Sequence, residues 1–179
     1  MRLFIAVPIP DKIKKTLAAI LDPIKQTISH IKWVIPDNFH FTLLFLGETS
    51  DNMVSPVIDR LRQITASVKP FIVHIENFSC FPSLKRPRIL FLSVDNGRDA
   101  IVNLAGSVRQ SLKELGFADN KEFKPHLTIG RVKQYQKIKL ESIKIKFDPV
   151  SFEADQIQLI QSILKPDGPV YNIVERFSL

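Results

Sequence analysis

Two short segments of this sequence pair an ionisable imidazole with a hydroxyl. The first runs from His40 to Gly47 (HFTLLFLG) and the second from His126 to Arg131 (HLTIGR), and both begin with histidine, an apolar residue, threonine and another apolar residue. Successive side chains of a β-strand point to opposite faces, so each histidine shares a face with the threonine two positions later. Phe41 and Leu127 then face the core. The pattern predicts the same polar pair on two separate strands.

Two imidazoles in one cleft suit the hydrolysis of a phosphodiester without a metal ion. One removes a proton from water while the other protonates the departing alkoxide, and a pKa of about 6.5 keeps both forms accessible near neutral pH. The hydroxyls of Thr42 and Thr128 are expected to donate to phosphate oxygens. Arg131 is expected to bring positive charge to the same anion. Strict alternation puts Arg131 on the opposite face from His126, so this role requires a bulge or bend, for which Gly130 is suited.

The residues give weaker support to other kinds of functional site, such as a metal site or a phosphate-binding loop. A single His-x-Thr segment carries little information, because most such segments are structural. Neither segment supplies further His, Asp or Glu ligands, which disfavours a zinc site on His40 and His126, so the sequence predicts no metal and no cofactor. It also has no glycine-rich phosphate loop and no nucleophilic serine motif. Trp33, Phe45 and Phe123 are more often core residues, but each is a candidate for stacking on a nucleobase.

The elements that must position the two histidines also repeat. The apolar run RLFIAV, which starts at Arg2, precedes the run RILFLSV at Arg88 by 86 positions, and 86 positions also separate His40 from His126. An amphipathic helix is predicted after each run, so strand, helix and histidine strand occur twice in the same order. This repeat predicts two similar lobes around a pseudo-twofold axis, with both histidines in a central cleft and residues 1–179 forming one domain of two intertwined lobes.

Apolar periodicity and turn residues predict the remaining helices and strands. The first helix is expected from Asp11 as N-cap, with Pro23 kinking or restarting it. A second helix is expected from Thr49–Asp51 up to Pro70, and a third over about Asp99–Leu115. Strands are expected over 71–78 and 88–94, and in the segments IKIKF, QIQLI and YNIVERF of the C-terminal region.

Composition narrows the class of protein further. The net charge of +7 over 179 residues favours polyanionic partners. The single cysteine, Cys80, excludes an intramolecular disulfide and fits a cytoplasmic protein. No apolar run is long enough for a membrane span or a signal peptide. We therefore expect a monomeric cytoplasmic protein that does not bind membranes.

On these residues the chain resembles the 2H phosphoesterase superfamily, and within it the RNA 2′,3′-cyclic phosphodiesterase branch, the 2′-5′ RNA ligase family. The likeness covers nearly the whole chain and is carried by RLFIAV, HFTLLFLG, PRILFLSV, FKPHLTIGRVK and IQSILKPDGPVYNIVERF. It implies a bilobal α+β fold with an antiparallel sheet and helices in each lobe. It also implies metal-independent opening of the 2′,3′-cyclic phosphate at an RNA 3′ end to a 2′-phosphomonoester. By this likeness His40 is the proton donor to the 3′-oxygen and His126 is the base acting on water.

Several alternatives stay open at this point. The same chemistry could act on 2′-5′ oligoadenylate or on a cyclic phosphate of ADP-ribose, and the family likeness also implies reversible joining of 2′-5′ linkages. A non-catalytic RNA-binding module would also explain the basic charge and the aromatic residues, although the presence of both His/Thr pairs argues against it. The residues alone do not decide which histidine is the acid, because the pattern is symmetric.

Overall fold

The strands in the described part of this protein form one antiparallel sheet. The computed structural model describes residues 1–117, 122–133 and 147–179. In the described residues the strands are β1 (Arg2–Pro8), β2 (Ile31–Trp33), β3 (His40–Glu48), β4 (Phe71–Phe81), β5 (Ile89–Val94), β6 (His126–Val132), β7 (Val150–Ala154), β8 (Gln156–Lys165) and β9 (Gly168–Ser178). They pair in the order β7-β4-β5-β6-β3-β1-β8-β9, and β2 pairs with β6 beside this path.

The centre of the sheet contains the repeat that the sequence predicts. The strands β3 and β6, which begin with the two histidines, are neighbours, and β1 and β5 flank them on either side. The helix α1 (Asp11–Thr27) follows β1, and α3 (Arg98–Lys113) follows β5. The expected order of strand, helix and histidine strand is therefore confirmed in both halves of this α+β fold.

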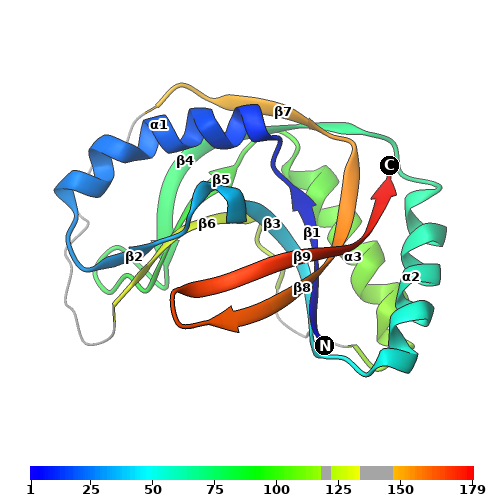
Figure 1. The fold of residues 1–179 in the computed structure, drawn as a ribbon. Coiled ribbons are helices and arrows are strands. Elements are labelled where there is room, and N and C mark those ends of the chain that lie inside the picture. Colours follow the sequence, from blue (N-terminus) through cyan, green and yellow to red (C-terminus); the bar gives the residue numbers. More distant parts are fainter. Residues whose placement is uncertain (118–121, 134–146) are drawn as a thin grey trace.

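The strands at the ends of the sheet connect the two halves of the chain. β4 and β7 extend the sheet beyond β5, whereas the hairpin of β8 and β9 returns to the first half and pairs with β1. Figure 1 shows this hairpin running beside β1. Residues near the C-terminus thus lie close to the strand that begins at Arg2.

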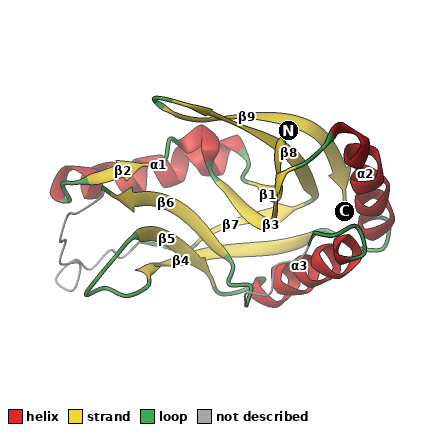
Figure 2. Cartoon of the chain, turned by 90° about the horizontal axis from the view of Figure 1, so that it is seen from below, coloured by secondary structure: helices red, strands yellow, loops and turns green. Residues whose placement is uncertain are grey.

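Helices cover the sheet at both ends of the molecule. α2 (Asp51–Thr65) and α3 lie together at one end, and α1 lies toward the other (Figure 1, Figure 2). Their apolar faces, which include Leu17 and Leu21 of α1 and Leu104 and Val108 of α3, are buried in one core with the sheet. Burial of these faces is the main favourable term for the fold.

Some local expectations are wrong. Pro10 is the N-cap of α1, and Asp11 is its first residue, ion-paired with Lys14 at 3.3 Å. The helix also continues through Pro23 to Thr27 instead of restarting. Asp22, directly before Pro23, lies within this continuous helix, and its carboxylate pairs with Lys25 at 2.8 Å.

Two strand expectations also differ from the structure or go untested. β4 runs on to Phe81, three residues beyond the expected end. The segment IKIKF (143–147) lies almost wholly outside the described residues.

Cys80 is buried, and its thiol is free. None of the helices in the described ranges is long and apolar enough to cross a membrane.

Candidate active site

The register of β3 and β6 brings the two His-x-Thr segments together. Phe41 pairs with Leu127 in antiparallel register, so His40 lies across from Thr128 and His126 lies across from Thr42. Phe41 and Leu127 are fully buried on the core side, while the four polar residues are half-buried on the opposite face. The expected shared face of both polar pairs is therefore confirmed.

A bulge turns Arg131 toward this face. In β6, Thr128 pairs with Phe91 and Gly130 with Leu90, which leaves Ile129 as an extra residue. The extra residue reverses the alternation, so Arg131 returns to the face of His126. The structure therefore contains the bulge that the sequence required for a phosphate-binding role of Arg131.

β3 contains a bulge at the equivalent position, but the residue that it turns to the polar face is not an arginine. Ala6 pairs with Thr42 and Ile5 with Leu44, so Leu43 is the extra residue. The carbonyl oxygen of Leu43 accepts a hydrogen bond from Nε of Arg109 at 3.3 Å. The bulge places Phe45 on the face of His40, in the position that Arg131 has in the other half. The polar face is thus symmetric in its histidines and threonines, but the two strands contribute only one arginine to it.

Gly130 allows β2 to approach the bulge closely. A Cβ at this position would lie 2.6 Å from Cγ2 of Ile31 and 3.2 Å from Cε3 of Trp33. We expect Gly130→Ala to lower the free energy of unfolding by about 1–3 kcal/mol, measured by urea denaturation. Gly106→Ala in α3 is the matched control, because no atom lies within 4 Å of its added Cβ, and alanine favours the helix. A Gly130→Ala variant as stable as the control would contradict the close approach.

Each imidazole is held by the backbone two residues earlier. Nδ1 of His40 donates to the carbonyl oxygen of Asn38 at 2.8 Å, and Nδ1 of His126 donates to that of Lys124 at 2.6 Å. A carbonyl only accepts, so Nδ1 carries the proton in both rings, and Nε2 is left for the polar face. Nε2 of His40 lies 3.0 Å from Oγ1 of Thr42, which donates to it when the imidazole is neutral. Both rings thus present the same nitrogen for proton transfer.

Burial keeps both imidazoles neutral in the free protein. Loss of hydration lowers the pKa of His40 to about 4, against the opposing effect of its bond to Asn38. Electrostatic repulsion from Lys14 and Arg131, and from His126 when it is protonated, contributes to this lowering of the pKa. Burial also lowers the pKa of His126, and Arg131 adds to that effect. An anion bound on this face would offset these positive charges and raise both pKa values.

Aromatic rings hold each imidazole in place. Phe4 and Tyr171 contact His40, with ring centroids 4.9 Å and 5.4 Å away. Phe81 and Phe91 contact His126 at 5.3 Å and 5.7 Å. These four positions were missed by the sequence reasoning, since they come from β1, β4, β5 and β9, and only the pairing of the strands brings them to the histidines. Tyr171 is the single ring of the four that carries a hydroxyl.

The three aromatic residues proposed for base stacking lie in different surroundings. Trp33 packs against the core and over Gly130, and Phe123 packs against the core beneath the guanidinium of Arg109, whose Cζ is 5.1 Å from its centroid. Phe45 is 65% exposed on the polar face. Of the three, Phe45 has the surroundings that stacking on a base requires, and its role stays a prediction.

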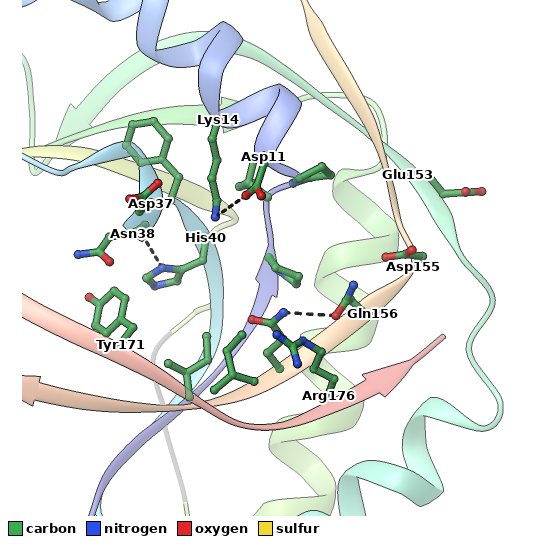
Figure 3. A pocket seen from close by; sticks show the side chains of 17 residues that line it. Asp11, Lys14, Asp37, Asn38, His40, Glu153, Asp155, Gln156, Tyr171 and Arg176 are labelled. Atoms are coloured by element: carbon green, nitrogen blue, oxygen red, sulfur yellow. Dashed lines mark hydrogen bonds and ion pairs between the residues drawn. The ribbon is translucent and has the colours of Figure 1, made fainter.

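A cavity of about 520 Å³ opens beside His40. Figure 3 shows His40, Asn38 and Tyr171 at one end and Gln156 and Arg176 at the other. The N-terminus of α1 and the hairpin of β8 and β9 form its walls, so the sequence offered no local signal for it. Among the described residues, no three His, Cys, Asp or Glu side chains gather as a metal-binding group.

Comparison with known protein families gives two consecutive matches. The family described as LigT like Phosphoesterase matches residues 7–91 and again residues 92–171, so each half of the chain matches separately. An RNA 2′,3′-cyclic phosphodiesterase of Archaeoglobus fulgidus is 38% identical over 99% of both chains. A protein of the same name from Thermotoga maritima is 32% identical over 97% of this chain and 93% of its own.

Solved structures share the fold over the full length. The crystal structure of a Thermus thermophilus protein superimposes with a TM-score of 0.83 at 29% identity, covering 100% of this chain and 98% of that one. A crystal structure of E. coli LigT complexed with 3′-AMP gives a TM-score of 0.79 at 23% identity, over 99% and 97% of the two chains. The second likeness is one of fold alone.

Proposed function

The chain belongs to the family of LigT-like phosphoesterases, and from this premise we propose that it hydrolyses the 2′,3′-cyclic phosphate at an RNA 3′ end to a 2′-phosphomonoester. The observation that carries the proposal is the matched pair of imidazoles. Each has Nδ1 fixed on a backbone carbonyl, which leaves Nε2 free for proton transfer on the shared polar face. Two groups of the same kind, held rigidly on one face, suit simultaneous removal and delivery of a proton.

The reaction follows from these positions. The cyclic phosphate binds with its non-bridging oxygens toward the hydroxyls of Thr42 and Thr128 and the guanidinium of Arg131. Nε2 of His126 takes a proton from water as the water oxygen attacks phosphorus. The bond from phosphorus to the 3′-oxygen breaks, and Nε2 of His40 gives its proton to that oxygen. The 2′-oxygen keeps the phosphate, and the two histidines end in exchanged protonation states.

The same site would join RNA if another nucleophile replaced water. A 5′-hydroxyl in place of water attacks the cyclic phosphate and yields a 2′-5′ linkage, as microscopic reversibility allows. The site as proposed needs no metal and no cofactor. Because residues of both halves contribute to one polar face, we also propose that residues 1–179 act as a single domain and a monomer. A cytoplasmic location stays a prediction.

Substrate comparison in the presence of a chelator tests this function. We expect turnover of a cyclic-phosphate-ended oligoribonucleotide to be unchanged by EDTA, and turnover of 2′-5′ oligoadenylate or of a cyclic phosphate of ADP-ribose to be much lower. Loss of activity with EDTA that added metal restores would contradict the metal-free mechanism. Salt-sensitive RNA binding without turnover of any cyclic phosphate would indicate a binding module instead.

The histidine pKa values predict an acidic optimum for the free enzyme. The productive form has one imidazole protonated, and burial lowers both pKa values below about 6.5. We therefore expect kcat/KM, which reports the free enzyme, to fall as the pH rises through 7. The bound phosphate raises both pKa values, so the profile of kcat should lie at higher pH. Initial rates over a wide pH range check this, and a kcat/KM that rises toward alkaline pH would contradict it.

A further inference from the structure

The cavity beside His40 differs in charge from the rest of the polar face. The carboxylates of Asp11, Asp37, Glu153 and Asp155 line it, against the cations Lys14 and Arg176. One of these cations, Lys14, is already paired with Asp11 at 3.3 Å. Arg131, which lowers the pKa of both histidines, does not line this cavity. A second phosphate would be repelled here, so the cavity suits an uncharged part of the substrate.

Apolar side chains and amides also line the cavity. Pro8, Ile160 and Ile173 line it, which suits the faces of a flat ring. Gln158 is only 8% exposed and lines the same space. Its Nε2 donates to Oε1 of Gln156 at 3.3 Å, while its own Oε1 has no protein partner among the described residues. An amide oxygen that has no protein partner in such a lining can accept a hydrogen bond from a ligand that donates an N–H group.

The cavity is also placed next to the reacting group. His40 and Tyr171 form its end wall, with Tyr171 edge-on to the imidazole at 5.4 Å between centroids. Asn38, whose carbonyl holds the imidazole, fixes the hairpin through its Nδ2, which donates to the carbonyl of Pro169 at 3.1 Å. A group bound here would therefore lie beside the imidazole of His40.

We propose that this cavity binds the base of the nucleotide that carries the cyclic phosphate, with the amide oxygen of Gln158 accepting an N–H from the edge of the base. The inference rests on the proposed function. It also distinguishes the roles of the two histidines, which the symmetric polar face does not. The ribose that carries the leaving 3′-oxygen belongs to the same nucleoside, so a base held beside His40 brings this ribose, and with it the leaving oxygen of the proposed reaction, to the side of His40. The attacking water then enters in line from the side of His126. This assigns His40 as the acid from the position of the base.

Comparison of a normal and an abasic substrate tests the proposal. Adenosine 2′,3′-cyclic phosphate and the same cyclic phosphate on a ribose without a base are assayed with the wild type and with Gln158→Leu. We expect the variant to lose about tenfold in kcat/KM on the adenosine substrate, mainly through KM, and nothing on the abasic one. Gln161→Leu, on the same strand but outside the cavity, should match the wild type on both. Wild-type turnover of the abasic substrate tests the proposed function separately.

A second variant tests the proposal if Gln158→Leu does not fold. Ile173 is 42% exposed at the cavity, so Ile173→Trp fills the space without disturbing the core. It should also raise KM for the adenosine substrate alone. Equal losses on both substrates, or no loss in either variant, would overturn the proposal. A loss confined to Phe45→Ala would overturn it too, and would put the base over Phe45.

Discussion

Replacing His126 or His40 by alanine should lower kcat by about 10²–10⁴-fold, the range that removal of a general acid or base produces. Both rings present Nε2 to the polar face, and no described group on that face duplicates their proton transfer. His74→Ala is the matched control, because His74 lies on β4 and its Nδ1 contacts Oγ of Ser151 at 2.8 Å, away from both pairs. Steady-state kinetics with purified variants measure the effect. Undiminished activity in either variant would refute the assignment.

A thiol leaving group separates the roles of the two histidines. Sulfur in place of the 3′-oxygen leaves readily without a proton, so it bypasses the general acid. We expect this substrate to restore much of the activity of His40→Ala and little of that of His126→Ala. The reverse pattern would exchange the two assignments. Unfolding temperatures of both variants, compared with His74→Ala, show whether the fold is retained.

Replacing Arg131 by glutamine should lower kcat by about 10²–10³-fold, as loss of one preorganised anion-binding donor does. The equivalent of Arg131 in β3 is Phe45, so the other histidine strand supplies no second arginine that could replace Arg131. The variant should also raise the pKa of both histidines, because Arg131 lowers both. NMR titration of the imidazole protons measures this effect independently of activity.

The control for this change is another arginine of the same charge. Arg98 is exposed at the start of α3, so Arg98→Gln removes one positive charge away from the two histidines. We expect this variant to keep wild-type activity and unshifted imidazole titrations. If both variants lose activity equally, the net charge of the protein matters more than the position of Arg131.

The histidine strands could be predicted because their information is local. Alternation in HFTLLFLG and HLTIGR indicates which residues share a face, and the 86-residue repeat indicates that the two strands belong together. The need for a bulge before Arg131 also follows from alternation, and Ile129 supplies it. The shared face of the candidate site was therefore accessible from the sequence.

The surroundings of the histidines depend on strand pairing over long distances. Tyr171 and Gln158 reach the cavity beside His40 only because the hairpin of β8 and β9 pairs with β1, more than 150 residues earlier. Several registers of alternating strands are compatible with one sequence until the whole sheet is assembled. Trp33 illustrates the same limit, since its burial depends on the absence of a side chain at Gly130. The cavity and the aromatic contacts were thus outside the reach of pattern reasoning.

The most direct test is to identify the product formed from an oligoribonucleotide with a 2′,3′-cyclic phosphate end. If His126 activates water and His40 protonates the 3′-oxygen, phosphorus NMR or enzymatic end analysis should find a 2′-phosphomonoester as the only product. A 3′-phosphomonoester, or no turnover by the wild-type protein, would contradict the proposed reaction.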